Sequence, residues 1–295
     1  MTRLVKLTNS TSVLVINPKR RLSPERAGKG TIACLFLCLL FLAGSFSAAL
    51  FPSPAAADTR CPASHIDQQA RVKSVHDGDT LTLKNGDKIR LIGINAPEVA
   101  RKSRPAEAFG NAARDYLRQR LPRGAAIELQ FGAEKKDRYG RTLAHVFLPG
   151  GENIQAALLL QGLASTLAIP PNTALASCYR RIEQQARCDG AGLWSDRQAI
   201  TESDQLTAGS SGFQRIKGRV ERVEKNRQGV WLHLAGDVTV GIRPDNLALF
   251  YTDALLSLQG KTLLVRGWLN KSRYSRFYIR VRHPLAIERL DNGDC

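Results

Sequence analysis

The stretch from Val75 to Glu98, VHDGDTLTLKNGDKIRLIGINAPE, constrains the fold more than any other part of the chain. Apolar residues alternate with polar ones on both sides of Asn85-Gly86. This pair favours the two positive φ angles of a tight hairpin turn. We therefore predict a β-hairpin centred on Asn85 and Gly86.

Polar groups gather at the two ends of this hairpin. Asp77 and Asp79 close the incoming strand, whereas Arg90, Asn95 and Glu98 follow the turn. Hard cations such as Ca²⁺ bind carboxylate, amide and carbonyl oxygens, and a guanidinium offers a fork that fits a phosphate. The stretch therefore indicates metal-assisted chemistry on a phosphodiester. Taken alone, however, Asp-Gly-Asp is more often only a turn, so the rest of the chain has to decide.

Further motifs favour the chemical interpretation. DGDT (77–80), RLIGINAPE (90–98), DRYGR (137–141) and GLW (192–194) occur in an order and at separations that resemble the staphylococcal nuclease (thermonuclease) family. The resemblance covers about residues 70–195. It implies an OB-type barrel and a divalent cation, with Ca²⁺ as the first expectation, although the sequence itself requires only a hard cation.

The resemblance also assigns roles to the motif residues. Asp79 is expected to bind the metal, with Asp77 close by, and Glu98 corresponds to the glutamate proposed to activate the attacking water. Arg90 and Arg141 correspond to the two arginines that grip the phosphate. This set is chemically consistent, because hydrolysis builds negative charge on the nonbridging oxygens and a cation with two guanidiniums stabilises that charge.

Other matched positions partly depart from the family. Arg138 and Tyr139 match a basic and an aromatic residue that contact the nucleotide. The family's second metal-binding aspartate falls at Asn95, and a threonine that binds metal through its backbone carbonyl falls at Ala96. Asn offers an amide oxygen but removes one formal charge, so we expect weaker or altered metal binding. The family's tyrosines before the proline loop are absent, with aliphatic residues at 167–169.

The charge of the chain favours a polyanionic partner. The formal net charge is +17, and residues 1–57 contain seven Lys or Arg and one Glu, so the remainder carries +11. Nucleic acid, DNA or RNA, is the commonest partner for so basic a protein, although charge alone does not exclude a generally basic protein without such a partner. Nothing in the sequence implies a protein partner.

The N-terminal segment has the pattern of an export signal. Basic residues precede an apolar run at 31–51, and the small residues Ala55, Ala56 and Ala57 follow. We interpret residues 1–57 as a signal peptide or, if the run stays uncleaved, as an N-terminal membrane anchor. Both alternatives place the body outside the cytoplasm, periplasmic or secreted, and only the second brings residues 31–51 into contact with the inner membrane.

Four cysteines lie outside the apolar run: Cys61, Cys178, Cys188 and Cys295. An even number in an exported chain suggests two disulfides, for which three connectivities exist. Cys178 and Cys188 fall in a helical pattern about 15 Å apart at the helical rise, beyond the reach of a disulfide. We therefore expect Cys61 to pair with one of these two. No Cys or His spacing is typical of zinc.

Hydrophobic periodicity predicts a barrel with three helices for residues 58–197, the expected catalytic domain. One helix opens at Pro105 and buries a face made of Phe109, Ala112, Ala113, Tyr116 and Leu117. Two more helices are expected at 153–161 and 175–186. Beyond the hairpin, strands are expected at 126–131 and 141–148, with a further short one at 163–169. Such a set is typical of a small closed barrel.

A second unit follows an aperiodic linker at 198–212. In residues 213–295 we expect strands at 217–223, 229–234, 238–242, 261–269 and 277–281, with a helix near 246–258. Three strands, a helix and two strands is again the order of an OB-like barrel. The expected fold class is therefore mainly β with α (α+β), with two successive barrels. The 295 residues, 43% of them hydrophobic, suffice for two such cores.

Aromatic and basic residues alternate in the second unit: Trp231, Trp268, Tyr274, Phe277 and Tyr278 with Arg266, Lys271, Arg273, Arg276, Arg280 and Arg282. Aromatic platforms in a basic groove hold single strands by stacking and phosphate contact. We give equal weight to the alternative, in which the aromatics are core and the arginines are solvated.

Taken together, the sequence predicts an exported, metal-dependent endonuclease that hydrolyses phosphodiester bonds of DNA, with RNA left open. The alternative, motivated by Asn95, is a catalytically weakened nucleic-acid-binding module. A third interpretation treats the barrels as an envelope-anchored structural or interaction protein. The residues do not separate DNA from RNA or fix a strand preference.

Overall fold

The computed structural model describes residues 61–101, 104–195 and 200–290. The expected signal peptide or anchor at 1–57 lies outside these residues, as does Cys295. No helix in the described part is long and apolar enough to cross a membrane.

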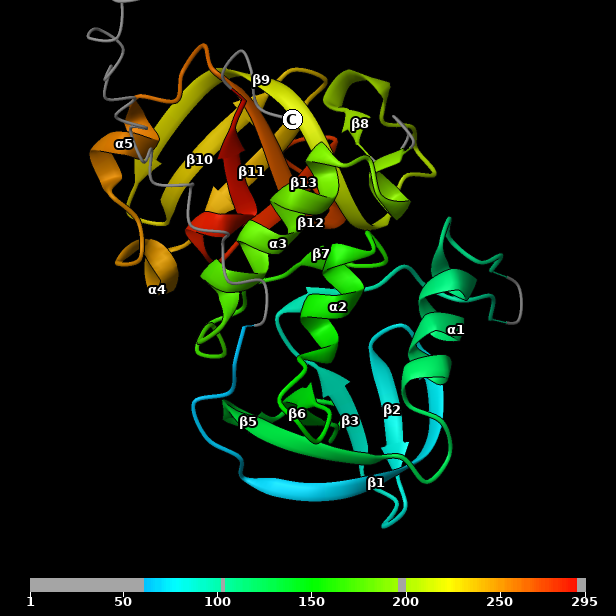
Figure 1. Ribbon diagram of the computed structural model, residues 1–295. Coiled ribbons are helices and arrows are strands. Elements are labelled where there is room, and N and C mark those ends of the chain that lie inside the picture. Colours follow the sequence, from blue (N-terminus) through cyan, green and yellow to red (C-terminus); the bar gives the residue numbers. More distant parts are fainter. Residues whose placement is uncertain (1–60, 102–103, 196–199, 291–295) are drawn as a thin grey trace, which may run out of the picture. The chain divides into compact units, whose positions relative to one another are not determined.

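The first half of the described chain forms a closed five-stranded barrel (Figure 1). Its strands are β1 (Gln68–Asp77), β2 (Thr80–Leu83), β3 (Lys88–Leu91), β5 (Ala126–Lys136) and β6 (Thr142–Phe147). Their order around the barrel is β1-β2-β3-β6-β5, and β3 and β6 pair in parallel whereas the other neighbours are antiparallel. The expected OB-type barrel is thus confirmed.

The hairpin formed by β2 and β3 has a different turn from the one predicted. β2 and β3 pair antiparallel, with Thr80 opposite Arg90. Only Gly86 has a positive φ, 95°. Asn85 instead accepts a hydrogen bond from the backbone N–H of Asp87 at 3.1 Å and stays out of the left-handed region. A four-residue loop, 84–87, therefore replaces the expected two-residue turn.

Three helices accompany this barrel: α1 (Gly110–Arg120), α2 (Ile154–Leu160) and α3 (Ala176–Cys188), with a 3₁₀ turn η1 (Gly192–Ser195). α1 starts five residues later than expected, because Phe109 adopts a left-handed backbone conformation (φ 65°) that interrupts any helix from Pro105. Ala113 and Leu117 are buried as expected, but Ala112 is exposed. The strand expected at 163–169 is reduced to β7 (Ser165–Thr166), which pairs with β4 (Ile94–Asn95).

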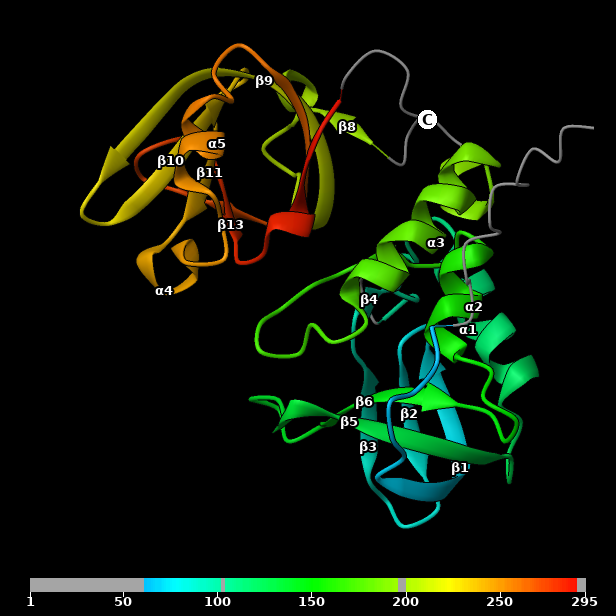
Figure 2. The ribbon, with the colours of Figure 1, turned by 60° about the vertical axis from the view of Figure 1, so that its left-hand side comes forward.

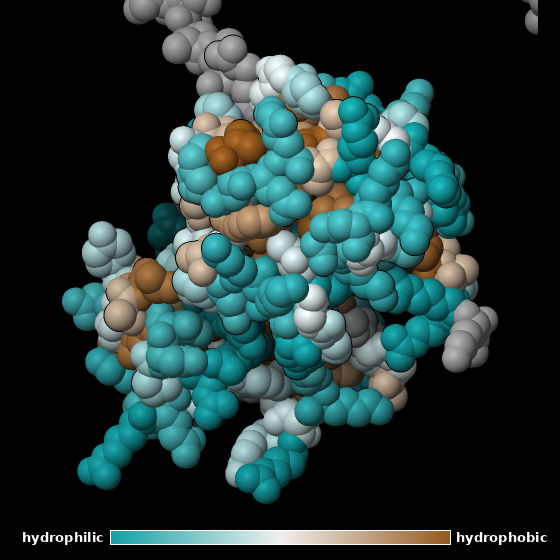
Figure 3. All heavy atoms as spheres, turned by 90° about the horizontal axis from the view of Figure 1, so that it is seen from below, coloured by the Kyte–Doolittle hydropathy of each residue, from teal (hydrophilic) through white to brown (hydrophobic). Residues whose placement is uncertain are grey.

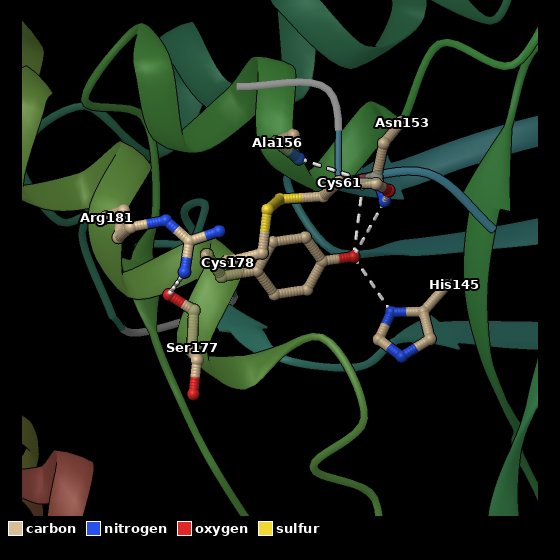
Figure 4. Close-up of a disulfide and its surroundings, with 8 residues drawn as sticks. Cys61, His145, Asn153, Ala156, Ser177, Cys178 and Arg181 are labelled. Atoms are coloured by element: carbon tan, nitrogen blue, oxygen red, sulfur yellow. Dashed lines mark hydrogen bonds between the residues drawn. A yellow bond between two sulfur atoms is a disulfide. The ribbon is translucent and has the colours of Figure 1, made fainter. Parts of the chain in front are cut away.

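A disulfide ties the start of the described chain to α3 (Figure 4). Cys61 pairs with Cys178 with a Cα–Cα distance of 5.8 Å, which confirms the expectation that Cys61 joins one of the two helical cysteines. Cys188 is disulfide-bonded as well. Beside the Cys61–Cys178 bridge, the hydroxyl of the fully buried Tyr179 shares hydrogen bonds with His145 (2.8 Å) and Asn153 (3.1 Å).

The second half repeats the same strand order (Figure 2). Its strands are β9 (Gly212–Asn226), β10 (Gly229–Leu234), β11 (Val238–Ile242), β12 (Thr262–Lys271) and β13 (Phe277–Val281). The order is β9-β10-β11-β13-β12, the pairing of β12 with β9 closes the barrel, and β11 and β13 are parallel, as β3 and β6 are in the first barrel. The second OB-like barrel is therefore confirmed.

Shorter elements complete this half: α4 (Pro244–Leu247), α5 (Thr252–Leu256), η4 (Pro284–Ala286) and β14 (Ile287–Arg289). The single helix expected near 246–258 is split because Tyr251 has an extended backbone between α4 and α5. The segment expected as a linker is packed on the second barrel. It contains β8 (Thr201–Glu202), which pairs with β9, and η3 (Ser203–Gln205), and its Leu206 is buried in the second core.

Apolar side chains gather in two separate cores, one in each barrel. Figure 3 shows one face of the molecule, where hydrophilic residues predominate and hydrophobic residues form only small patches.

A buried ion cluster joins the two halves. Glu183 of α3 is fully buried and pairs with Arg266 of β12 and with Arg180 at 2.7 Å. Glu288 of β14 pairs with Arg180 and, at 2.8 Å, with Arg187. Burial by itself would raise the pKa of Glu183, but Arg266 and Arg180 outweigh it and lower that pKa. The ionised carboxylate of Glu183 thus connects helix α3 of the first half to strand β12 of the second barrel.

We expect Glu183→Ala to destabilise the fold by about 3–5 kcal/mol, because the buried guanidinium of Arg266 loses its counter-ion. Chemical denaturation measures this loss. The matched control is the exposed Glu221, whose replacement by Ala should change the free energy of unfolding by less than about 0.5 kcal/mol. Equal effects of the two substitutions would contradict a structural role for the cluster.

His145 makes the first barrel sensitive to acid. Burial lowers the pKa of His145 to about 4, below the value of about 6.5 in an unfolded chain. The unfolded state therefore binds the proton first, and stability present above pH 6.5 is lost as the pH falls towards 4, by up to about 3 kcal/mol. Urea unfolding at pH 7 and pH 4.5 should show a smaller drop for His145→Gln than for wild type. An identical drop in both proteins would contradict this assignment.

Candidate active site

The two carboxylates of the DGDT motif lie in the turn between β1 and β2. The backbone N–H of Asp79 donates to Oδ1 of Asp77 at 3.2 Å, which fixes the turn. Gly78 is required between them, because a Cβ there would lie 2.6 Å from the Cβ of Ala96 and 2.7 Å from that of Ala113. The turn is thus pressed against both the loop after β3 and helix α1.

Asp79 is buried, and both of its carboxylate oxygens have hydrogen-bond or ion-pair partners. Its Oδ2 lies 3.0 Å from Nη2 of Arg90 and accepts a 3.0 Å hydrogen bond from the N–H of Ala96, while Oδ1 accepts one from the hydroxyl of Thr80 at 3.1 Å. Burial raises the pKa of Asp79 to about 6, against the opposing effect of Arg90. Burial thus opposes the charged form of this carboxylate, and the Arg90 guanidinium favours it.

The guanidinium of Arg90 contacts several oxygens of the segment that follows β3. Its Nη2 donates to the carbonyl of Ile94 at 3.1 Å and lies 3.5 Å from Oδ1 of Asn95, and its Nη1 donates to the carbonyl of Leu91. The amide of Asn95 in turn donates to the carbonyl of Ala96 at 3.4 Å. The structure thus brings the predicted residues Asp79, Asn95 and Ala96 together around one guanidinium.

Glu98 lies at the exposed rim of this group, with 62% of its side chain accessible. Its backbone is fixed, because its carbonyl accepts from the N–H of Glu107 at 2.9 Å and its N–H donates to the Glu107 carboxylate at 3.0 Å. The first residue of α1 packs closely there, since a Cβ on Gly110 would lie 2.3 Å from the Glu98 carbonyl oxygen. The start of α1 therefore positions Glu98.

Arg101 is a site residue that the sequence interpretation did not assign. Its Nη2 lies 2.8 Å from Oδ2 of Asp77 and 3.3 Å from Oε2 of Glu98, so it bridges the two carboxylates. The only signal in the sequence was its spacing three residues after Glu98 in a basic loop.

The turn between β5 and β6 holds Arg141. Asp137 accepts from the backbone N–H groups of Tyr139 and Arg141 at 2.9 Å each, and from Nε of Arg141 at 2.7 Å. Tyr139 is 68% exposed, and the Arg138 guanidinium stacks on its ring at 4.8 Å. Asp137 is thus a second residue without a predicted role, and it orients the arginine of the motif.

Two cavities connect these groups. One of about 380 Å³ is lined by Asp77, Arg101 and Arg141, together with His76, Thr80, Lys88 and Val99. A larger one of about 720 Å³ is lined by Arg90, Arg138, Tyr139 and Arg141, among others. Arg141 lines both cavities and Arg90 lines the larger one, so the two arginines border one space. Glu98 lines neither cavity and reaches the smaller one only through its contact with Arg101.

Comparison with known proteins follows this geometry. Residues 88–196 match the family model described as staphylococcal nuclease homologue. A thermonuclease of Staphylococcus intermedius is 34% identical over 126 residues, which are 42% of this chain and 74% of that protein. The chain belongs to the staphylococcal nuclease family.

Further relatives fit this assignment. A thermonuclease of Staphylococcus hyicus is 32% identical over 133 residues, 44% of this chain and 78% of the relative. Endonuclease YhcR of Bacillus subtilis is 32% identical over 152 residues, which are 48% of this chain but 12% of that longer protein. These matches cover less than half of this chain.

The donor set of this family member suits a hard cation. Within the described residues, no group of three or more His, Cys, Asp or Glu could hold a metal ion. The two carboxylates, the Asn95 amide oxygen and the Ala96 carbonyl are all oxygen donors, which Ca²⁺ and Mg²⁺ prefer, and both ions commonly keep water ligands. The chemistry of these donors therefore suits a hard divalent cation.

Proposed function

We propose that this chain is a divalent-cation-dependent nuclease that hydrolyses phosphodiester bonds of DNA, with RNA as a further substrate to be tested. The observation that carries the proposal is that Arg141 lines two cavities, the larger one with Arg90 and the smaller one with Asp77. Asp79 pairs with Arg90, and Glu98 contacts the same Arg101 guanidinium as Asp77. Membership in the family, and relatives named thermonuclease and endonuclease, support the same chemistry.

The two arginines would hold the phosphate. The pentacoordinate transition state of hydrolysis concentrates negative charge on the nonbridging oxygens, and guanidiniums fixed beforehand stabilise it without reorganising. Arg90 is fixed by Asp79 and backbone carbonyls, and Arg141 by Asp137. Arg138 and the exposed ring of Tyr139, on the same turn as Arg141, would contact the nucleotide.

Glu98 would take the proton from the attacking water. A general base has to reach both water and the site, and the Glu98 side chain is exposed at the rim while its backbone is fixed by Glu107 and α1. Arg101 would position this carboxylate through its bridge to Asp77.

Asp79, the Asn95 amide oxygen and the Ala96 carbonyl would hold the cation, with Asp77 close by, and Ca²⁺ is the first candidate. The ion would add positive charge against the phosphate oxygens. Because Asn95 is neutral where the family has a second aspartate, this donor set carries one negative charge fewer.

We further propose export of this protein, with the segment 1–57 as signal peptide or anchor. The Cys61–Cys178 disulfide supports it, because such bonds persist in oxidising compartments. The proposed organisation is a catalytic domain at 58–197 and an accessory domain at 213–295, joined by the segment 198–212.

Replacing Glu98 with Gln should lower the rate constant for DNA cleavage by about 10²–10⁴-fold, the range for a lost general base. Arg141→Ala should lower it by about 10²–10³-fold, as for a lost transition-state donor. A gel-based plasmid assay measures both. The control is Arg123→Ala, an exposed arginine in the loop before β5, which should cut at the wild-type rate. Wild-type rates for folded Glu98→Gln and Arg141→Ala would refute the assigned roles.

Restoring the missing charge should tighten metal binding. In Asn95→Asp we expect the Ca²⁺ concentration for half-maximal cleavage to fall by about tenfold, because ligand charge sets the affinity of such sites. Isothermal titration of Ca²⁺ gives an independent measure. Asn111→Asp adds the same charge on an exposed face of α1 and should have little effect. No difference between the two variants would place the cation elsewhere.

The second candidate is a nucleic-acid-binding module with weakened catalysis, which the neutral Asn95 favours. Binding that survives chelation, without cleavage in Ca²⁺, Mg²⁺ or Mn²⁺, would support it. Cleavage that depends on any of these cations would exclude it.

A further inference from the structure

Two aromatic rings form a continuous surface on the outside of the second barrel. Trp231 of β10 and Tyr278 of β13 are half-buried, whereas the residues on either side of them in both strands are buried, so their rings lie on the outer face. The ring centroids are 6.2 Å apart. Gly241 of β11 lies between them, and a Cβ there would come within 2.7 Å of both rings. We call Trp231, Gly241 and Tyr278 the aromatic platform.

Positive charge surrounds this platform. Arg243, Arg280 and Arg282 all lie close enough to Tyr278 to lower the pKa of its hydroxyl, although burial raises it more. Asp245 pairs with Arg280. The surroundings of Tyr278 thus carry three guanidiniums and one carboxylate, which favours a polyanion over a neutral ligand.

Tyr278 of the platform lines the same cavity as Arg90 and Arg141. The cavity of about 720 Å³ is lined from the second barrel by Tyr278, Arg280, Arg282, Trp268 and Asn270, and from the first by the residues described above. Trp268 is 45% exposed.

Leu167, Ala168 and Ile169 of the first domain also line this cavity and are aliphatic, whereas Glu134, Asp137 and Asn172 are polar. The second barrel contributes the indole of Trp268 and the phenol ring of Tyr278, and the first barrel contributes the phenol ring of Tyr139. The buried pair of Glu183 and Arg266 links the two barrels, and Arg266 itself lines the cavity.

We propose that a single strand of nucleic acid runs from the clamp of Arg90 and Arg141 onto the second barrel, where its bases stack on Trp268 and Tyr278 and its phosphates contact Arg280 and Arg282. This proposal rests on the proposed nuclease function, whose substrate class it specifies. A single strand is required, because the faces of bases in a duplex are already stacked on each other, whereas exposed aromatic rings bind the faces of unpaired bases.

The test measures binding by the full chain carrying Glu98→Gln, which slows cleavage during the measurement. Fluorescence anisotropy follows a labelled 15-nucleotide single strand and the corresponding duplex. We expect Tyr278→Ala and Trp268→Ala each to raise the Kd for the single strand by roughly tenfold, the effect of losing one stacked base. Tyr278→Phe, which keeps the ring, should bind like the parent.

Tyr251 provides a matched control, because it is an aromatic residue of the same barrel, is 88% exposed and does not line the cavity. Tyr251→Ala should therefore leave the Kd unchanged. Thermal unfolding identifies any variant that fails to fold. If Tyr278→Ala does not fold, the binding measurement with Trp268→Ala tests the proposal. Unchanged single-strand affinity in the folded ring variants, or equal affinity for duplex and single strand, would overturn the proposal.

The design separates this proposal from the nuclease assignment. Loss of single-strand binding in the Trp268 and Tyr278 variants, combined with no cleavage by wild type in any cation, would support stacking on the second barrel and refute the nuclease. Cleavage by wild type with unchanged binding in these variants would refute the stacking proposal alone.

Discussion

The ion pair between Asp79 and Arg90 is the interaction on which the rest of the site depends. It joins the turn between β1 and β2 to strand β3, and both partners are largely buried. The same two side chains also bind the backbone of Ile94 and Ala96, so the loop that leads to Glu98 takes its position from them. Removing either partner would leave a buried charge and release this loop.

The two barrels show that the fold alone does not supply this chemistry. Both have the same strand order and the same parallel pair. In the first barrel the turn between the first two strands carries Asp79, and the parallel pairing of β3 with β6 brings Arg141, just before β6, beside β3. The corresponding turn of the second barrel holds Arg227 and Gln228, without a carboxylate. In our proposals, one architecture thus serves a catalytic site in the first barrel and a binding surface in the second.

Much of this fold could be predicted from local patterns. The limits predicted for β10 and β11 are the observed ones, and the order of elements indicated both barrels. The alternation of aromatic and basic residues in the second unit could not predict which side chains face outward. Phe277 lies in the core, whereas its neighbour Tyr278 is on the surface. Arg266 is buried, and local sequence could not predict this, because its counter-ion Glu183 lies 83 positions away on helix α3. Arg101 and Asp137 likewise gain their roles only from spatial neighbours.

Cleavage of plasmid DNA by the purified chain tests the central claim most directly. The protein is stripped with EDTA and then supplied separately with Ca²⁺, Mg²⁺ and Mn²⁺, and circular dichroism verifies that it is folded throughout. Our account predicts no cutting in EDTA and recovery of cutting with at least one of the cations. Folded protein that cuts with none of them, or equally well in EDTA, would contradict a cation-dependent nuclease.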